Sequence, residues 1–247
     1  MTDTVRTGSG SGRPGADGGF AVVEMFTSQG CNSCPPAEEV LSQIDRDARE
    51  QGQPVYALGF HVDYWDHLGW ADPYGDPAHT LRQEAYARAF GSGGLYTPQM
   101  VVNGTVEFVG SNDRAASSAI RSALGEAAAT SLALSVEDVD GGDGRRLAVD
   151  YQAEGRPEQA VLNVAVVQRG LENDVPRGEN AGRRLRQDGV VRAFTSAKLD
   201  MGRGRVEITV PPDLDPRRAS VVGYVQNDGD KSIVGAAAVD VSAESRT

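Results

Sequence analysis

Two cysteines placed three residues apart are the most reactive side chains of this chain. Cys31 and Cys34 stand in the segment GCNSCP, residues 30–35, between a short apolar run and an amphipathic stretch. This context predicts a strand, a turn and a helix, so that the pair lies at a helix N-terminus, where unpaired N–H groups and the helix dipole lower the pKa of a thiol. Cys31 is then the attacking thiolate, and Cys34, further into the turn, resolves the mixed disulfide.

The same spacing also occurs in metal sites and in structural disulfides, so two other interpretations stay open. The first alternative is a copper- or zinc-binding carrier that uses Cys31, Cys34 and His61 as ligands. The second is a binding protein whose disulfide is only structural. Two cysteines are too few for a disulfide-rich scaffold or for a four-thiolate zinc site from one chain. In the redox interpretation, which we favour, the protein is an enzyme that needs neither a metal nor a cofactor.

Hydrophobic periodicity places the cysteine pair inside a βαβ unit. Residues 20–26 and 54–60 are short apolar runs typical of buried strands, and the stretch between them has apolar residues at helical spacing. A second helix is marked by Asp76 as N-cap, Pro77 and a stop at Gly91. Its apolar face is predicted to consist of Ala78, Leu81, Ala85, Ala89 and Phe90.

The rest of the chain is predicted to be rich in strands. Asn103-Gly104 between residues 99–102 and 105–109 indicates a hairpin, and a third helix follows over about 112–127. From residue 131 the period changes to two, which predicts an all-β sandwich with strands at 131–138, 145–153, 160–169, 189–199, 204–210, 219–227 and 231–241. We therefore expect a flexible tail over 1–19, an α/β domain over 20–130 and a β-sandwich domain over 131–247.

The order β-α-β-α-β-β-α, with the cysteines after the first strand, resembles the thioredoxin superfamily. Thr97-Pro98 stands just before the hairpin, where that fold carries a cis-proline facing the cysteine pair. Glu24, on the strand before the motif, resembles the buried acid of thioredoxin. The resemblance therefore implies a thioredoxin-like domain, followed here by the β-sandwich. One departure is that Pro35 and Pro36 follow the second cysteine directly, which predicts an irregular first helical turn.

Longer stretches are similar to a bacterial thioredoxin-like family of unknown function whose members are often exported. The matching segments are VEMFTSQGCNSCPPA at 23–37, FHVDYWDHLGW at 60–70, YTPQMVVNG at 96–104 and RGENAGR at 177–183. The resemblance implies a thiol–disulfide oxidoreductase acting on a protein or small-molecule thiol or disulfide. The last segment belongs to a stretch, 177–186, with four arginines, which either clamps an anionic group or forms a solvated loop between strands.

Several further residues are candidates for the site. Glu24 is a carboxyl in an apolar strand that either passes protons to the inner thiol or pairs with an arginine. Thr97 and Pro98 are expected to shape a substrate groove, with a cis peptide between them. In the loop after the second strand, His61, Asp63 and Trp65 either tune the thiols and bind substrate, or pack over the sheet and cap turns.

Charge and composition exclude several classes of partner. The net charge of −11 leaves no long-range attraction for nucleic acid. No stretch approaches the ~18 consecutive apolar residues of a membrane span. Residues 1–19 contain no apolar run, so we expect neither a signal peptide nor membrane insertion, and the compartment stays open because similar proteins are often exported. The sandwich domain is expected to contribute to substrate choice or to formation of a homodimer.

Overall fold

The computed structural model describes residues 18–141, 144–155, 159–199 and 202–241. The tail expected at 1–19 lies largely outside these residues. The described part of the chain contains three α-helices and thirteen strands, so it is a mixed α/β protein in which strands predominate. The helices are α1 (Pro35–Gln51), α2 (Pro77–Phe90) and α3 (Asp113–Leu124), with short 3-10 turns at Asp66–Leu68 and Pro216–Arg218.

Apart from β8 and β9, which were not predicted, the strands follow the expected order of elements. The first half of the chain contributes β1 (Ala21–Thr27), β2 (Val55–His61), β3 (Gln99–Val102) and β4 (Val106–Val109). The second half contributes β5 (Ser131–Gly141), β6 (Gly144–Glu154), β7 (Ala160–Gln168), β8 (Leu171–Val175), β9 (Arg183–Gln187), β10 (Val190–Lys198), β11 (Arg203–Thr209), β12 (Ala219–Asn227) and β13 (Ile233–Asp240).

One large sheet runs through both halves of the chain. Its eight strands are ordered β13-β12-β7-β10-β2-β1-β3-β4. The two halves meet where β10 lies parallel to β2, with Val190 opposite Gly59 and the Gly59 N–H donating to the Gly189 carbonyl at 2.7 Å. The boundary expected near residue 130 falls between α3 and β5, and the sheet continues across it.

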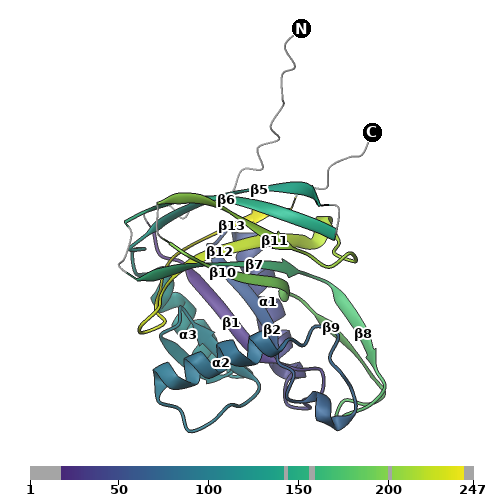
Figure 1. Ribbon diagram of the computed structural model, residues 1–247. Coiled ribbons are helices and arrows are strands. Elements are labelled where there is room, and N and C mark those ends of the chain that lie inside the picture. Colours follow the sequence, from purple (N-terminus) through teal and green to yellow (C-terminus); the bar gives the residue numbers. More distant parts are fainter. Residues whose placement is uncertain (1–17, 142–143, 156–158, 200–201, 242–247) are drawn as a thin grey trace.

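A second layer covers the C-terminal half of the large sheet. The three-stranded sheet β11-β6-β5 packs over β7, β12 and β13, and the two sheets enclose a core of aliphatic side chains that includes Leu132, Leu147, Leu162 and Val221. Figure 1 shows β5 and β6 above β7, β12 and β13 of the large sheet, with α2 and α3 toward the opposite end of the molecule. This half is therefore sandwich-like, with one layer supplied by the large sheet.

The helices cover both faces of the N-terminal half of the sheet. Successive side chains of a strand point to opposite faces, and β1 follows this rule: Ala21, Val23 and Met25 pack with residues of α1 and α3, whereas Val22 and Phe26 pack with Tyr86 of α2. The cysteine pair therefore lies on the side of the sheet that α1 covers.

The prediction for the buried face of α2 is wrong. Leu81 is 61% exposed, while His79, Gln83 and Tyr86 are buried against the sheet. The sheet beneath α2 itself carries polar side chains, and Gln83 donates to the Tyr96 carbonyl at 2.7 Å and to Gln99 at 2.9 Å. Polar groups buried by packing need such partners, so tertiary hydrogen bonds outweigh the apolar spacing of this helix.

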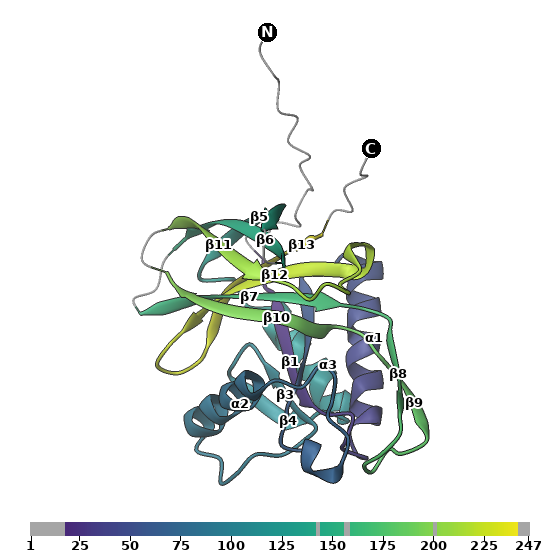
Figure 2. The ribbon, with the colours of Figure 1, turned by 45° about the vertical axis from the view of Figure 1, so that its right-hand side comes forward.

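A hairpin extends from the second half of the chain to the cysteine end of α1. Strands β8 and β9 pair with each other over Leu171–Val175 and Arg183–Gln187 and join neither larger sheet. Figure 2 shows this hairpin running beside α1 toward the loops at that end. The stretch 177–186, expected to be a loop between sandwich strands, is thus the tip and second strand of a hairpin.

Candidate functional site

The cysteine pair occupies the loop between β1 and α1, as the sequence indicates. Cys34 is the N-cap residue of α1, and both cysteines are free thiols without exposed surface. Cys34 has helical backbone angles, φ −76° and ψ −38°, and its carbonyl accepts from the Glu38 N–H at 3.0 Å. The first turn is therefore regular despite Pro35 and Pro36, because prolines at the first two helical positions lack only N–H groups that have no intrahelical partner.

The pKa values of the two thiols are shifted in opposite directions. A hydrogen bond from the Cys34 thiol, assisted by Ser33 and Thr97 and opposed by burial, lowers the pKa of Cys31 to about 6. The Ser33 hydroxyl lies 3.2 Å from the Cys31 sulfur. Burial, together with the hydrogen bond and charge of Cys31, raises the pKa of Cys34 far above its usual range. Cys31 is therefore a thiolate at neutral pH, while Cys34 keeps its proton.

Three predicted residues form the wall beside Cys31. The Thr97–Pro98 peptide is cis, which confirms that expectation, and the Thr97 carbonyl oxygen lies 3.9 Å from the Cys31 sulfur. The indole N–H of Trp65 donates to the Thr97 hydroxyl at 2.8 Å, so this half-exposed ring is fixed next to the same loop. Thr97, Pro98 and Trp65 are thus brought together near Cys31.

His61 and Asp63 make other contacts. His61 ends β2 and is buried, with its Nδ1 atom 2.7 Å from the Asp72 carboxylate. Burial alone would lower the pKa of His61, but Asp72 and Glu38 raise it above its usual value. Asp63 instead accepts a hydrogen bond from the Thr80 hydroxyl of α2 at 2.5 Å. Among the described residues, no three His, Cys, Asp or Glu side chains are close enough to share a metal ion.

Glu24 lies on the opposite face of the sheet from α1. It is fully buried, and its carboxylate accepts from the Arg82 guanidinium at 2.7 Å and from the Tyr224 hydroxyl at 2.8 Å; the Tyr86 hydroxyl also donates to it. The guanidinium lies over the rings of four aromatic residues, at 5.0–5.6 Å from their centroids. Glu24 is therefore buried and also paired with an arginine, and none of its hydrogen bonds reaches a cysteine.

Glu38 is a buried carboxyl on the cysteine side, and sequence reasoning did not select it. Its Oε1 atom accepts from the Thr27 hydroxyl at 2.8 Å and from Gln187 at 2.9 Å, and burial raises its pKa. The Thr27 hydroxyl also forms a hydrogen bond with the Cys34 thiol. The signal in the sequence was its spacing, because Glu38 stands four residues after Cys34 and so lies on the same helix face.

The tip of the β8–β9 hairpin is a second part of the site that sequence reasoning missed. Asn180 has no exposed surface, and its amide donates to the carbonyls of Gln29 at 2.9 Å and Cys31 at 2.8 Å. Glu179 accepts from the Asn32 N–H at 3.0 Å. The arginine-rich stretch around 177–186 therefore contacts the cysteine loop through its neutral and acidic residues.

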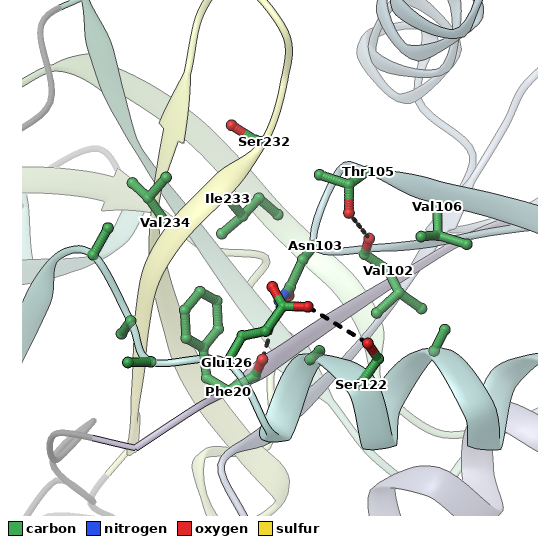
Figure 3. A pocket seen from close by; sticks show the side chains of 15 residues that line it. Phe20, Val102, Asn103, Thr105, Val106, Ser122, Glu126, Ser232, Ile233 and Val234 are labelled. Atoms are coloured by element: carbon green, nitrogen blue, oxygen red, sulfur yellow. Dashed lines mark hydrogen bonds between the residues drawn. The ribbon is translucent and has the colours of Figure 1, made fainter.

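A separate cavity of about 290 Å³ lies away from the cysteines, between α3 and the start of β13. Figure 3 shows Phe20, Asn103, Ser122, Glu126 and Ile233 among the residues that line it. The Asn103 amide donates to the Phe20 carbonyl at 3.0 Å and accepts from Val22 at 2.7 Å. None of the predicted site residues lines this cavity, and its central amide is already paired.

Fold and site together define a mixed α/β protein with a large sheet and a pair of neighbouring thiols at the start of a helix. Residues 22–226 match the family described as "Protein of unknown function (DUF1223)", and the chain belongs to this family. A search of the curated proteins found no match.

Two solved structures are similar to the chain. A protein of Agrobacterium tumefaciens solved by structural genomics is 28% identical, with a TM-score of 0.64 over 92% of this chain and 96% of its own. HBP35 of Porphyromonas gingivalis is 15% identical, with a TM-score of 0.62 over 94% of this chain and 79% of its own. At that identity the second likeness shows the fold alone.

Proposed function

We propose that this protein is a thiol–disulfide oxidoreductase of the thioredoxin superfamily, with a thioredoxin-like domain at 20–130 and a sandwich-like domain at 131–247. One observation carries the proposal: the Cys31 sulfur lies at a helix start, beside a second thiol, and faces the Thr97 carbonyl. A thiol with a pKa near 6 is mostly deprotonated at neutral pH, and a neighbouring thiol can release it from a mixed disulfide.

The reaction passes two electrons to a disulfide substrate. The Cys31 thiolate attacks one substrate sulfur, forms a mixed disulfide and releases the other substrate sulfur as a thiolate. Cys34 then loses its proton and attacks the Cys31 sulfur, which forms the Cys31–Cys34 disulfide and releases the second substrate thiolate. A more reducing dithiol restores the Cys31–Cys34 thiols. A more oxidising disulfide instead keeps the pair oxidised, and the same steps then run in reverse and convert a substrate dithiol to its disulfide.

The Cys34 proton needs an acceptor, because burial keeps this thiol protonated at neutral pH. Glu38 is the residue placed for this role in our proposal, with the Thr27 hydroxyl between the two groups. Thr27 accepts the proton from Cys34 and passes its own to the carboxylate. Burial raises the pKa of Glu38 and so makes it a better proton acceptor.

Substrate binding in this proposal uses the wall beside Cys31. The Thr97 backbone offers hydrogen-bonding groups next to the thiolate, and Trp65 offers a half-exposed aromatic face. These groups suit an extended peptide or a small disulfide. His61 and Asp63 act at a distance in this arrangement, since their side chains hold Asp72 and Thr80.

Trapping the intermediate tests the proposal. The Cys34→Ser variant, incubated with an insulin-type disulfide substrate, is expected to accumulate a mixed disulfide at Cys31, and Cys31→Ser is expected to form none. Both variants should lose reductase turnover. Full activity in both variants would contradict the redox proposal. Stoichiometric copper or zinc in anaerobically purified protein, lost on changing either cysteine, would instead favour the metal-carrier alternative.

A further inference from the structure

The peptide group that joins Cys31 to Asn32 is held on both sides by the β8–β9 hairpin. Its carbonyl accepts from the Asn180 amide at 2.8 Å, and its N–H donates to the Glu179 carboxylate at 3.0 Å. The two holding residues are neighbours at the hairpin tip, about 150 residues away in sequence. This peptide is therefore fixed in orientation by a segment outside the β1–α1 unit.

The hairpin tip is itself held rigidly. The Arg183 guanidinium donates to the Asn180 side-chain oxygen at 2.8 Å, which fixes the direction of the amide. Gly178 has φ at +78°, which favours glycine, and a Cβ added there would be in ordinary van der Waals contact with the Gly30 Cα, at 3.7 Å. Further along β9, the Gln187 amide donates to Glu38 and its oxygen accepts from Gln29 at 2.9 Å. The hairpin thus joins the cysteine loop at several points.

We propose that the hairpin tip is a clamp for the nucleophile, in which Asn180 and Glu179 are positioning residues that hold the Cys31–Asn32 peptide. The clamp proposal rests on the proposed function, in which the Cys31 thiolate attacks the substrate disulfide. The hydrogen bonds that stabilise this thiolate come from Ser33 and Cys34, in the turn that begins with the clamped peptide, and from Thr97 outside it. When that peptide can rotate, these donors lose their alignment with the sulfur, and the thiolate becomes less stable.

Measuring the thiolate content of Cys31 distinguishes whether Asn180 and Glu179 position the Cys31–Asn32 peptide or only stabilise the fold. The charged and titratable side chains around this turn are Cys34 of α1, Tyr64 of the loop after β2, and Glu179 and Arg183 of the hairpin. The reduced full-length protein is titrated by the ultraviolet absorbance of the thiolate, with Cys31→Ser as the blank. This readout needs neither a substrate nor access to the sulfur.

Two matched pairs of variants carry the test. Asn180→Ala removes the clamp, while Asn173→Ala removes an asparagine of the same hairpin whose side-chain oxygen accepts from Gln29 and Tyr74. Glu179→Ala and Glu179→Gln remove the same exposed charge, but only glutamine keeps an acceptor for the Asn32 N–H. Comparing the members of the second pair therefore cancels the effect of charge.

The clamp predicts a higher titration midpoint of Cys31 in Asn180→Ala than in Asn173→Ala, and in Glu179→Ala than in Glu179→Gln. A rise of one pH unit from about 6 lowers the thiolate content at pH 6.5 about threefold. Coinciding midpoints within both pairs would overturn the proposal. Glu179 is exposed, so the second pair decides if Asn180→Ala does not fold. Failure of the oxidoreductase proposal would appear instead as absence of the mixed disulfide in Cys34→Ser, while the differences in titration midpoint within the two pairs persist.

Discussion

Replacing Glu24 by glutamine separates a structural role for this buried acid from a role in proton transfer. The side chain keeps its size, but Arg82 loses the carboxylate that accepts from it at 2.7 Å. A buried charge left without its partner costs about 3–5 kcal/mol. The four aromatic rings around the guanidinium stabilise it in part, so we expect a loss near the lower end of that range.

The loss is large beside the total stability of a domain, which is about 5–15 kcal/mol. For a chain of this size, it lowers the Tm by roughly 10 °C. Urea unfolding followed by circular dichroism measures the change in free energy, and the double variant Glu24→Gln/Arg82→Met should recover much of it because no unpaired charge remains.

Activity is the second half of the assay. Below the melting temperature, the folded Glu24→Gln variant should reduce a disulfide substrate at the wild-type rate, since Glu24 lies on the face of the sheet opposite α1. A variant of wild-type stability whose turnover falls tenfold would refute this reasoning and return Glu24 to the role of proton carrier.

Three further predictions concern the cysteine side of the sheet. At pH 7, Cys31 with a pKa of about 6 holds about 90 times more thiolate than a thiol of pKa 9.0, but each thiolate is about 20-fold less nucleophilic. Cys31 should therefore react with a disulfide substrate about four times faster than an ordinary thiol does, and its rate should have a midpoint near pH 6. A midpoint near pH 9 would contradict the lowered pKa. Glu38→Gln should slow release of the mixed disulfide, measured by quenched-flow mass spectrometry. Burial raises the pKa of Glu38, so the stability of the wild-type protein falls as the pH rises above the ordinary value of 4.5. The variant should therefore be more stable than the wild-type protein at pH 7 and equally stable in acid. Asp72→Asn should destabilise the protein most between pH 3.8 and 6.5, the ordinary pKa values of Asp72 and His61, because both groups of the pair are charged there. The loss should be smaller at higher pH, where His61 loses its proton. If the difference in urea midpoint between variant and wild type does not change with pH, the result would speak against this buried pair.

Much of the fold follows from the sequence because its signals are local. The alternating runs after residue 131 became strands within a few residues of the expected bounds, and the Asn103-Gly104 turn joins β3 to β4. Asp76 caps α2 through its side chain, as its position before Pro77 predicts. Each of these depends on a pattern of two to ten neighbouring residues, which the rest of the chain does not change.

The position of the buried acid could not be predicted in the same way. Glu24 and Glu38 both stand close to the cysteines in the sequence, but a strand sends neighbouring side chains to opposite faces. Which face of β1 is covered by α1 depends on how the whole sheet is covered. Val22 and Phe26 stand two residues before and after Glu24, so they share its face of the sheet, and they pack under α2. The helical spacing of Cys34 and Glu38 was the more reliable signal, because it fixes the face without reference to the sheet.

The β8–β9 hairpin escaped prediction for a different reason. Its strands alternate buried and exposed side chains over only five residues each, and most of the exposed ones are charged. A short polar strand pair of this kind is marginal by itself, so its stability depends on what its tip and inner face contact. Those contacts are Gln29, Cys31 and Glu38, all from the first half of the chain.

The cysteine site therefore belongs to both halves of the chain. The first half supplies the thiols, Thr97 and Glu38; the second half supplies Asn180 and Gln187, which are buried against them. The edge of β2 beside the site is likewise covered by β10 through Gly59 and Val190. Without the second half, Glu38 and the carbonyl of Cys31 would lose buried hydrogen-bond donors, which are costly to leave unreplaced. The second half of the chain is thus, through this hairpin, a structural component of the thiol site, in addition to any role of the sandwich-like layers in substrate choice or dimer formation.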